Sequence, residues 1–156
     1  MSNEKLFNFI QRCTNPNELR KMIRNAQSVI QSGSQDLQSA NDNLIAARDR
    51  LWVVSAEKHK PTDDIERALL VALYAYENVL SDAKGKQVYA RRIRNKMNEV
   101  GIIAAATNAV LKGNTQGLNK LKEWNRLSAS FEAVIIKHKS KFSADVVAAA
   151  KRNLEI

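Results

Sequence analysis

Apolar residues recur along most of this chain at intervals of three and four positions, which is the period of one face of an α-helix. Residues 37–54 give a long example, and a shorter one covers residues 4–12. The short alternating runs bounded by turn residues that would indicate strands are missing from the sequence. The pattern therefore predicts an all-α protein.

The second expected helix has a clear start. Asn15 is a suitable N-cap, and Pro16 needs no N–H at the first helical position. This helix is expected to stop at Gly33, where Ser34 is expected to cap the third. A connection this short favours an antiparallel helical hairpin over residues 16–58.

Residues 65–80 are apolar on nearly every side of a helix. A helix of this kind is usually buried in the middle of a bundle. Asp63 is expected to cap its N-terminus, Glu66 to reach back to free N–H groups, and Gly85 to end it. The sequence thus predicts a buried central helix near residues 65–80.

The helical pattern continues through the C-terminal half. A helix is expected over residues 87–100, and Gly101 either ends it or merely interrupts it before further helical residues. Its inward side is expected to hold Tyr89, Ile93, Met97 and Val100. Later helices are expected from residues 118 and 144 onward.

A length of 156 residues is typical of one domain. Hydrophobic residues make up 44% of the chain and charged residues 26%, as in ordinary folded proteins. We expect a single-domain bundle of six to eight helices over residues 1–156. In this bundle the hairpin 16–58 would pack on a C-terminal helical core of residues 62–156.

Positive charge is concentrated in one short part of the chain. The formal net charge is +9, which favours polyanionic partners and says nothing about fold. Residues 61–83 carry five acidic side chains and one basic one, whereas residues 84–100 carry six basic side chains and one acidic one. The six basic side chains all lie between Lys84 and Lys96, so this segment is the candidate binding site.

With Ile93 toward the core, helical geometry points Arg91 outward and puts Arg94 on a flank. Arginine holds phosphate groups in a bidentate way, asparagine can pair with adenine, and lysine can follow a nucleic-acid backbone. The expected nucleic-acid-binding residues are Lys84, Lys86, Arg91, Arg92, Arg94, Asn95, Lys96 and Asn98. The leading hypothesis is a helical protein that binds DNA or RNA, mainly through phosphates.

Two further features bear on this hypothesis. Tyr89 shares the inward side of the helix with Ile93, so it is expected in the core rather than stacked on a base. A helix-turn-helix arrangement, with residues 87–100 in a DNA groove, is an alternative. The turn at residues 81–86 is longer than that motif usually has.

A protein partner is the main rival from another class. The basic face would then dock on an acidic protein, and this chain would be an inhibitor or accessory subunit. The acidic helix before it is an equally good partner for the basic segment. Glu77 lies among apolar neighbours and is expected to pair with Arg91 or Arg94, and Glu132 needs a partner for the same reason.

A metal-dependent nuclease is the third alternative. Asp63, Asp64 and Glu66 are able to bind a magnesium ion beside a phosphate, but helix capping explains the same acids with fewer assumptions. The single cysteine and the two histidines are scattered and do not have the spacing of metal ligands. We therefore expect no catalytic residue, no metal and no cofactor.

The sequence shows no basic start followed by an apolar run, and no apolar run of about 18 residues. Its single cysteine, Cys13, fits a reducing compartment. We expect a cytoplasmic protein without a membrane partner. The sequence does not distinguish DNA from RNA, and it does not indicate an oligomeric state.

Overall fold

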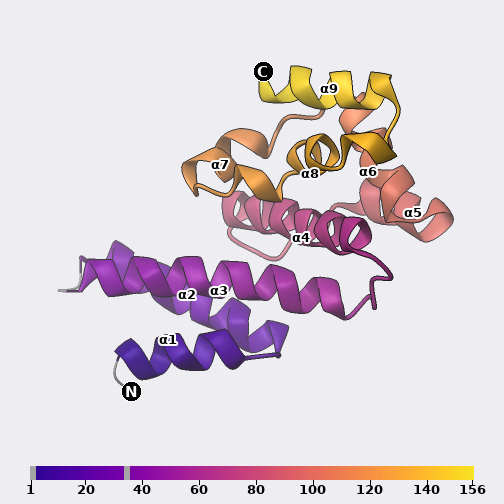
Figure 1. Ribbon diagram of the computed structural model, residues 1–156. Helices are drawn as coiled ribbons and strands as arrows, with labels where there is room; N and C mark the ends of the chain where they lie inside the picture. The colour runs from indigo at the N-terminus through magenta and orange to yellow at the C-terminus, as the bar shows by residue number, and fades with distance from the viewer. Residues whose placement is uncertain (1–2, 34–35) are drawn as a thin grey trace. The chain divides into compact units, whose positions relative to one another are not determined.

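The computed structural model describes residues 3–33 and 36–156 (Figure 1). All regular structure in these ranges is helical, with nine α-helices and two short 3₁₀ helices. The predicted all-α bundle is therefore confirmed. The predicted cap at Ser34 lies outside the described residues, and within them the side chain of Asp36 caps the third helix by accepting from the Ser39 N–H.

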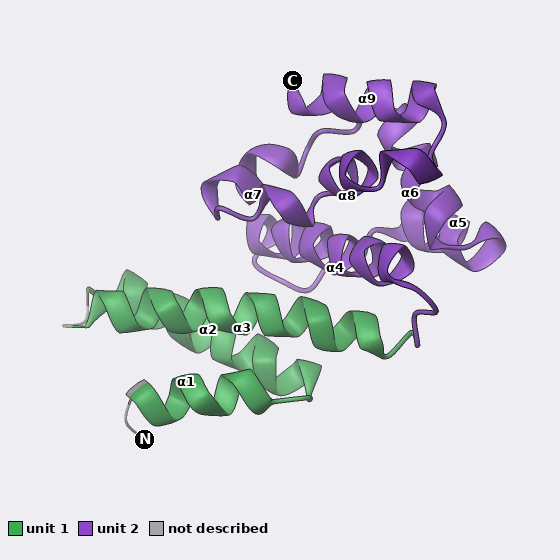
Figure 2. Ribbon diagram, viewed as in Figure 1, with its two compact units in different colours: residues 1–59 green, residues 60–156 purple. Residues whose placement is uncertain are grey.

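The chain divides into two compact units, residues 1–59 and residues 60–156 (Figure 2). The division falls close to the expected boundary between the hairpin and the C-terminal core. That the two form one domain stays a prediction, and each unit is described by itself.

The first unit contains three helices, α1 (Asn3–Arg12), α2 (Pro16–Gln31) and α3 (Leu37–Glu57). Asn15 caps α2 as expected, because its side-chain oxygen accepts from the backbone N–H groups of Asn17 and Glu18 at 2.9 and 3.3 Å. α2 packs along α3 to form the hairpin, and α1 packs on α3 as well. The core between them includes Ile10, Leu19 and Leu51.

Two side chains of this unit differ from the expected pattern. The apolar Phe9 on α1 is 43% exposed, whereas the charged Arg48 on α3 is only 8% exposed. α3 has two neighbouring helices and buries a face wider than one apolar stripe, so Arg48 falls within it. α1 has only ten residues and buries a narrow stripe around Ile10, which leaves Phe9 outside.

The second unit is built around α4 (Asp64–Lys84). Leu69, Leu70 and Leu73 on this helix are at most 2% exposed, so the predicted buried central helix is confirmed. α4 contacts α6, α7 and α8, and α9 covers α6 and α8. The other elements of the unit are α5 (Arg91–Val100), α6 (Ile102–Leu111), α7 (Leu118–Glu123), α8 (Phe131–Lys137), α9 (Ala144–Leu154) and the 3₁₀ helices Leu127–Ala129 and Lys139–Lys141.

The predicted start of a helix at residue 87 is wrong. Residues 85–90 contain no helix, and α5 begins at Arg91. Two side chains of α4 accept hydrogen bonds from the backbone N–H groups of Val88 and Ala90. These bonds hold the segment in place of helical hydrogen bonds. Gly101, at φ 91°, then separates α5 from α6, which settles the question of one helix or two.

Among residues 3–33 and 36–156, no helix has both the length and the apolar character that a membrane crossing requires.

The N-cap of α4 provides a stability test. Asp63 accepts the Glu66 N–H at 2.8 Å, whereas the side chain of Asp64 is 94% exposed and pairs with Arg67 at 3.2 Å. Asp63→Ala is expected to lower the free energy of unfolding by about 1 kcal/mol, because it removes the cap. Asp64→Ala is expected to cost less than about 0.5 kcal/mol. Urea denaturation measures both, and equal losses would contradict the capping role.

Candidate nucleic-acid interface

The candidate interface is organised by a buried carboxylate, Glu77, which is 5% exposed on α4. Arg94 on α5 contacts it with two nitrogens, Nε to Oε2 at 2.5 Å and Nη2 to Oε1 at 2.7 Å. The backbone N–H of Ala90 also donates to Oε2, at 2.8 Å. The expected ion pair of Glu77 is thus confirmed with Arg94, and three donors satisfy the carboxylate.

The segment before α5 is anchored to α4 in the same manner. Ser81 Oγ accepts the Val88 N–H at 2.9 Å and lies 3.3 Å from the Val88 carbonyl oxygen, to which it donates. Gly85, at φ 69°, lets the chain turn back directly after α4. Residues 85–90 therefore run back along the last turns of α4, and this path determines where α5 begins.

Arg94 has two aromatic neighbours. Its guanidinium carbon lies 4.9 Å from the centre of the Tyr89 ring and 5.3 Å from that of Tyr74. Both distances are in the range of cation–π attraction. The hydrogen bond with Glu77 raises the pKa of Arg94 above its ordinary value, so the side chain stays charged. Arg94 is therefore held in place by Glu77 and by two rings.

Tyr89 is not a core residue, contrary to the prediction. Its side chain is 48% exposed, and its hydroxyl accepts from Gln87 Nε2 at 2.8 Å. The prediction failed because it assumed a helix from residue 87, whereas Tyr89 lies in the non-helical segment before α5. Val100, also expected inside, is 54% exposed, while Ile93 and Met97 are partly buried.

The remaining basic side chains of the segment stay available. Besides Arg94, the segment has five basic side chains: Lys84, Lys86, Arg91, Arg92 and Lys96. Among the residues that the structure describes, none of these five makes an ion pair or a side-chain hydrogen bond. Lys96 is partly buried and the other four are exposed, as are Asn95 and Asn98. Thus only Arg94 of the segment is paired with the acidic helix α4, and the other five basic side chains could contact a partner.

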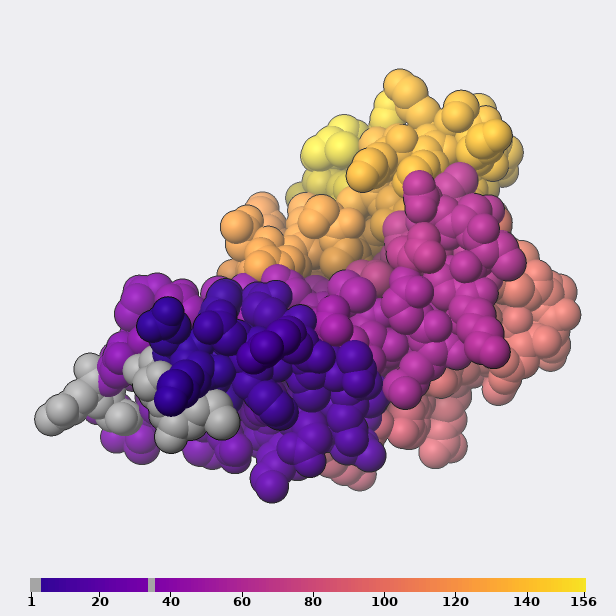
Figure 3. All heavy atoms as spheres, turned by 60° about the horizontal axis from the view of Figure 1, so that its bottom comes forward, coloured from indigo at the N-terminus to yellow at the C-terminus, as the bar shows by residue number. Residues whose placement is uncertain are grey.

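The N-terminus of α5 adds to this positive region. Its N-cap residue, Ala90, offers no side-chain acceptor for the first N–H groups of the helix. Free N–H groups at a helix start carry a partial positive charge that favours an anion. In the space-filling view, the salmon-coloured atoms around residue 100 form part of the surface (Figure 3). The Arg91 N–H donates to the Tyr89 carbonyl oxygen at 3.0 Å, and no side chain caps the N–H groups of Arg92 and Ile93 beside the exposed arginines.

Three residues of this arrangement were missed by the sequence reasoning: Tyr74, Ser81 and Gln87. Ser81 acts on Val88 seven positions later, and Glu77 acts on Ala90 thirteen positions later. Both contacts join α4 to the non-helical segment 85–90, so a periodic pattern within one helix does not reveal them. The one available signal was the run of polar and glycine residues after Asp82, which indicated a turn but not its path.

The acids of the nuclease alternative are engaged at the start of α4. Asp63 is the N-cap, Glu66 accepts from Thr62 Oγ1 at 2.8 Å, and Asp64 pairs with Arg67. Within the described ranges, no group of three or more histidine, cysteine, aspartate or glutamate side chains is arranged to hold a metal ion. These contacts are those of helix capping.

A second buried carboxylate, Glu132 on α8, is 4% exposed. It lines a small cavity of about 30 Å³ together with Tyr76 and Gly117, among others. Burial raises the pKa of Glu132, and a hydrogen bond from its own backbone N–H opposes this effect. Among the described residues it has no ion-pair partner, so the expected pairing with an arginine is not found there.

No protein-family model matches the chain, and no curated protein or solved structure has significant similarity to it.

The Glu77 pair leads to a direct test. Glu77→Gln is expected to lower the free energy of unfolding by about 3 kcal/mol, because it leaves Arg94 partly buried without its counter-charge. Arg91→Gln, which removes an exposed charge from the same helix, is expected to change it by less than about 0.5 kcal/mol. Urea denaturation measures both. Similar losses of stability in the two variants would show that the Glu77–Arg94 ion pair does not hold residues 85–90 and α5 against α4.

The pKa of Glu132 gives a pH test. Because burial raises this pKa in the folded state, stability is expected to fall as the pH rises between the ordinary and the raised value. Glu132→Gln removes this loss. The variant should therefore be more stable than the original protein at about pH 8, with a smaller difference at about pH 3.5, where both states are protonated. Equal differences in urea denaturation at the two pH values would contradict this assignment.

Proposed function

We propose that this protein binds single-stranded nucleic acid with the surface at the start of α5. The observation that carries the proposal is the exposed Tyr89 ring, held by Arg94 and flanked in the chain by five basic side chains without a partner among the described residues. Basic side chains beside an exposed aromatic ring are the usual composition of a surface that binds nucleic-acid strands. DNA and RNA both fit this chemistry.

Phosphate contacts would supply most of the affinity. Arg91 and Arg92 are exposed at the first turn of α5, where uncapped N–H groups reinforce their charge. Lys84 and Lys86 are exposed on the turn that leads to it. Charges of this kind release counterions when they meet phosphates, so binding depends steeply on salt.

Tyr89 is the reason for preferring single strands. A tyrosine ring stacks on an unpaired base, whereas the bases of a duplex are already stacked on one another. The Arg94 guanidinium and the Gln87 side chain hold the Tyr89 ring, which lowers the entropy lost when a base stacks on it. We assign Arg94 this positioning role, in place of the direct contact expected from the sequence.

Fluorescence polarisation with a labelled single-stranded oligonucleotide and its duplex, at about 50 and 200 mM salt, tests the proposal. The single strand is expected to bind more tightly, and both affinities are expected to fall with salt. Arg91→Ala/Arg92→Ala should reduce the slope of log affinity against log salt by about 1.4 for the single strand. Tyr89→Ala should weaken single-strand binding about tenfold, and Tyr89→Phe, which keeps the ring but loses the Gln87 hydrogen bond, should weaken it less.

The matched control is Lys151→Ala/Arg152→Ala, which removes the same charge from exposed positions on α9. This control is expected to lose less affinity for the single strand than Arg91→Ala/Arg92→Ala. Absence of binding at low salt, or equal losses in both double variants, would overturn the proposal. Isolation with a stoichiometric acidic protein and little nucleic acid would instead favour the protein-partner alternative.

A further inference from the structure

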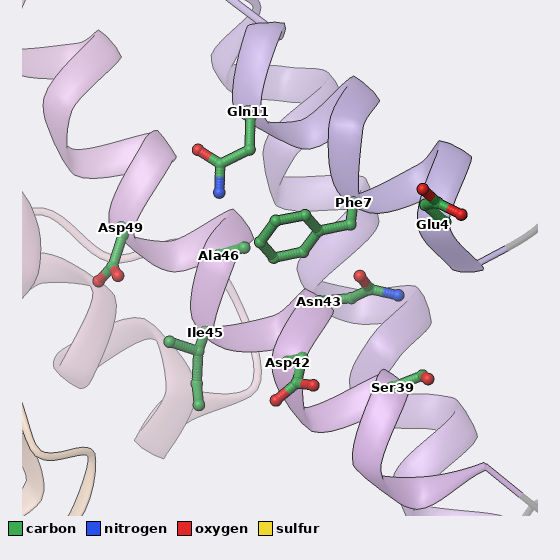
Figure 4. Close-up of a pocket in the computed structure, with 9 residues that line it drawn as sticks. All are labelled: Glu4, Phe7, Gln11, Ser39, Asp42, Asn43, Ile45, Ala46 and Asp49. Atoms are coloured by element: carbon green, nitrogen blue, oxygen red, sulfur yellow. The ribbon is translucent and has the colours of Figure 1, made fainter.

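The first unit contains an open groove of about 540 Å³ between α1 and α3 (Figure 4). α1 contributes residues three and four positions apart, so they share one face of that helix. α3 contributes residues from the face that is turned toward α1. The groove is lined by Glu4, Phe7, Gln11, Ser39, Asp42, Asn43, Ile45, Ala46 and Asp49.

The charge of the groove is opposite to that of the chain. The protein has 25 lysine and arginine residues and 16 acidic ones, yet the lining contains three carboxylates and no basic residue. Phe7 and Ile45 add apolar surface, at 38% and 41% exposed. An acidic lining with apolar side chains fits a ligand that joins a positive charge to an apolar body.

Asn43 supplies an independent indication of a ligand. This residue is only 7% exposed, and its amide has no hydrogen-bond partner among the described residues. It lines the groove, and Figure 4 shows it projecting from α3 toward the space beside Phe7. A nearly buried amide normally has its hydrogen bonds satisfied. Both polar atoms of the amide are reached by solvent at the groove, so a donor from a ligand would replace water at its oxygen.

We propose that this groove binds a peptide segment of a partner protein through an arginine side chain. The guanidinium donates to the Asn43 oxygen, Glu4 and Asp42 supply negative charge in the surrounding lining, and the aliphatic part of the arginine covers Phe7. Asp42 already accepts from Gln38 Nε2 through Oδ1, which leaves Oδ2 for the ligand. A peptide is favoured over a free small molecule because the groove is open along the two helices, whereas small-molecule sites usually enclose most of their ligand.

The experiment uses the full-length protein and a labelled octapeptide in which two arginines alternate with leucines. In the control peptide, citrulline replaces both arginines, which keeps the shape of the side chains and removes their charge. Fluorescence polarisation at low salt is expected to show binding of the arginine peptide at least about tenfold tighter than that of the citrulline peptide. No binding, or equal binding of the two peptides, would overturn the proposal.

Two variants locate the binding. Glu4→Gln/Asp42→Asn changes two exposed groove residues and should weaken the arginine peptide about tenfold. Glu18→Gln/Glu155→Gln makes the same change of charge at exposed positions outside the groove and should leave binding unchanged. Thermal melting of both double variants shows that they are folded. Equal losses in the two would show an effect of net charge alone and would overturn the site.

Two further measurements address other occupants. Spermidine that displaces the peptide at an equal concentration would show a site for small cations and would overturn the peptide assignment. Sedimentation that shows a dimer, lost in Glu4→Gln/Asp42→Asn, would identify a second copy of this chain as the occupant and would also overturn it. The proposal is supported if the protein is a monomer and only other arginine-containing peptides displace the labelled peptide.

Discussion

The organisation of the basic segment depends on one buried carboxylate. Glu77 lies in the apolar middle of α4, where Arg94 and the Ala90 N–H satisfy its two carboxylate oxygens. Those contacts hold the chain against α4 after Gly85 and bring the first turn of α5 to a defined position. They also put the Arg94 guanidinium against the Tyr89 ring. One ion pair thus links the burial of α4 to the exposure of the candidate interface.

The sequence predicted the parts of the fold that follow from local periodicity. The all-α class, the Asn15 and Asp63 caps and the buried helix around Leu69 were all readable, because apolar spacing and capping residues act within one or two turns. The position of Tyr89 was not readable. It depends on the capture of backbone groups by Glu77 and Ser81 across seven to thirteen positions, and an extrapolated helical projection placed the ring on the wrong side.

The same limit applies to the groove of the first unit. Phe7 and Asn43 lie far apart in sequence, and only the packing of α1 on α3 brings them to one surface. Composition gave no warning of it, since a chain with a net charge of +9 is expected to repel basic ligands. Net charge therefore does not describe the charge of each local surface. The lining of the groove between α1 and α3 is acidic, whereas the segment at the start of α5 is basic.

The segment from Gly85 to Ala90 has one more consequence. Its backbone is tied to α4 at Val88 and at Ala90, so the number of residues between the ties and α5 fixes the rotation of that helix about its axis. Inserting or deleting one residue after Ala90 would turn every following side chain by about 100°. Arg94 would leave Glu77, and a different face of α5 would meet solvent. The basic segment should therefore tolerate exchanges of side chains far more readily than changes of length.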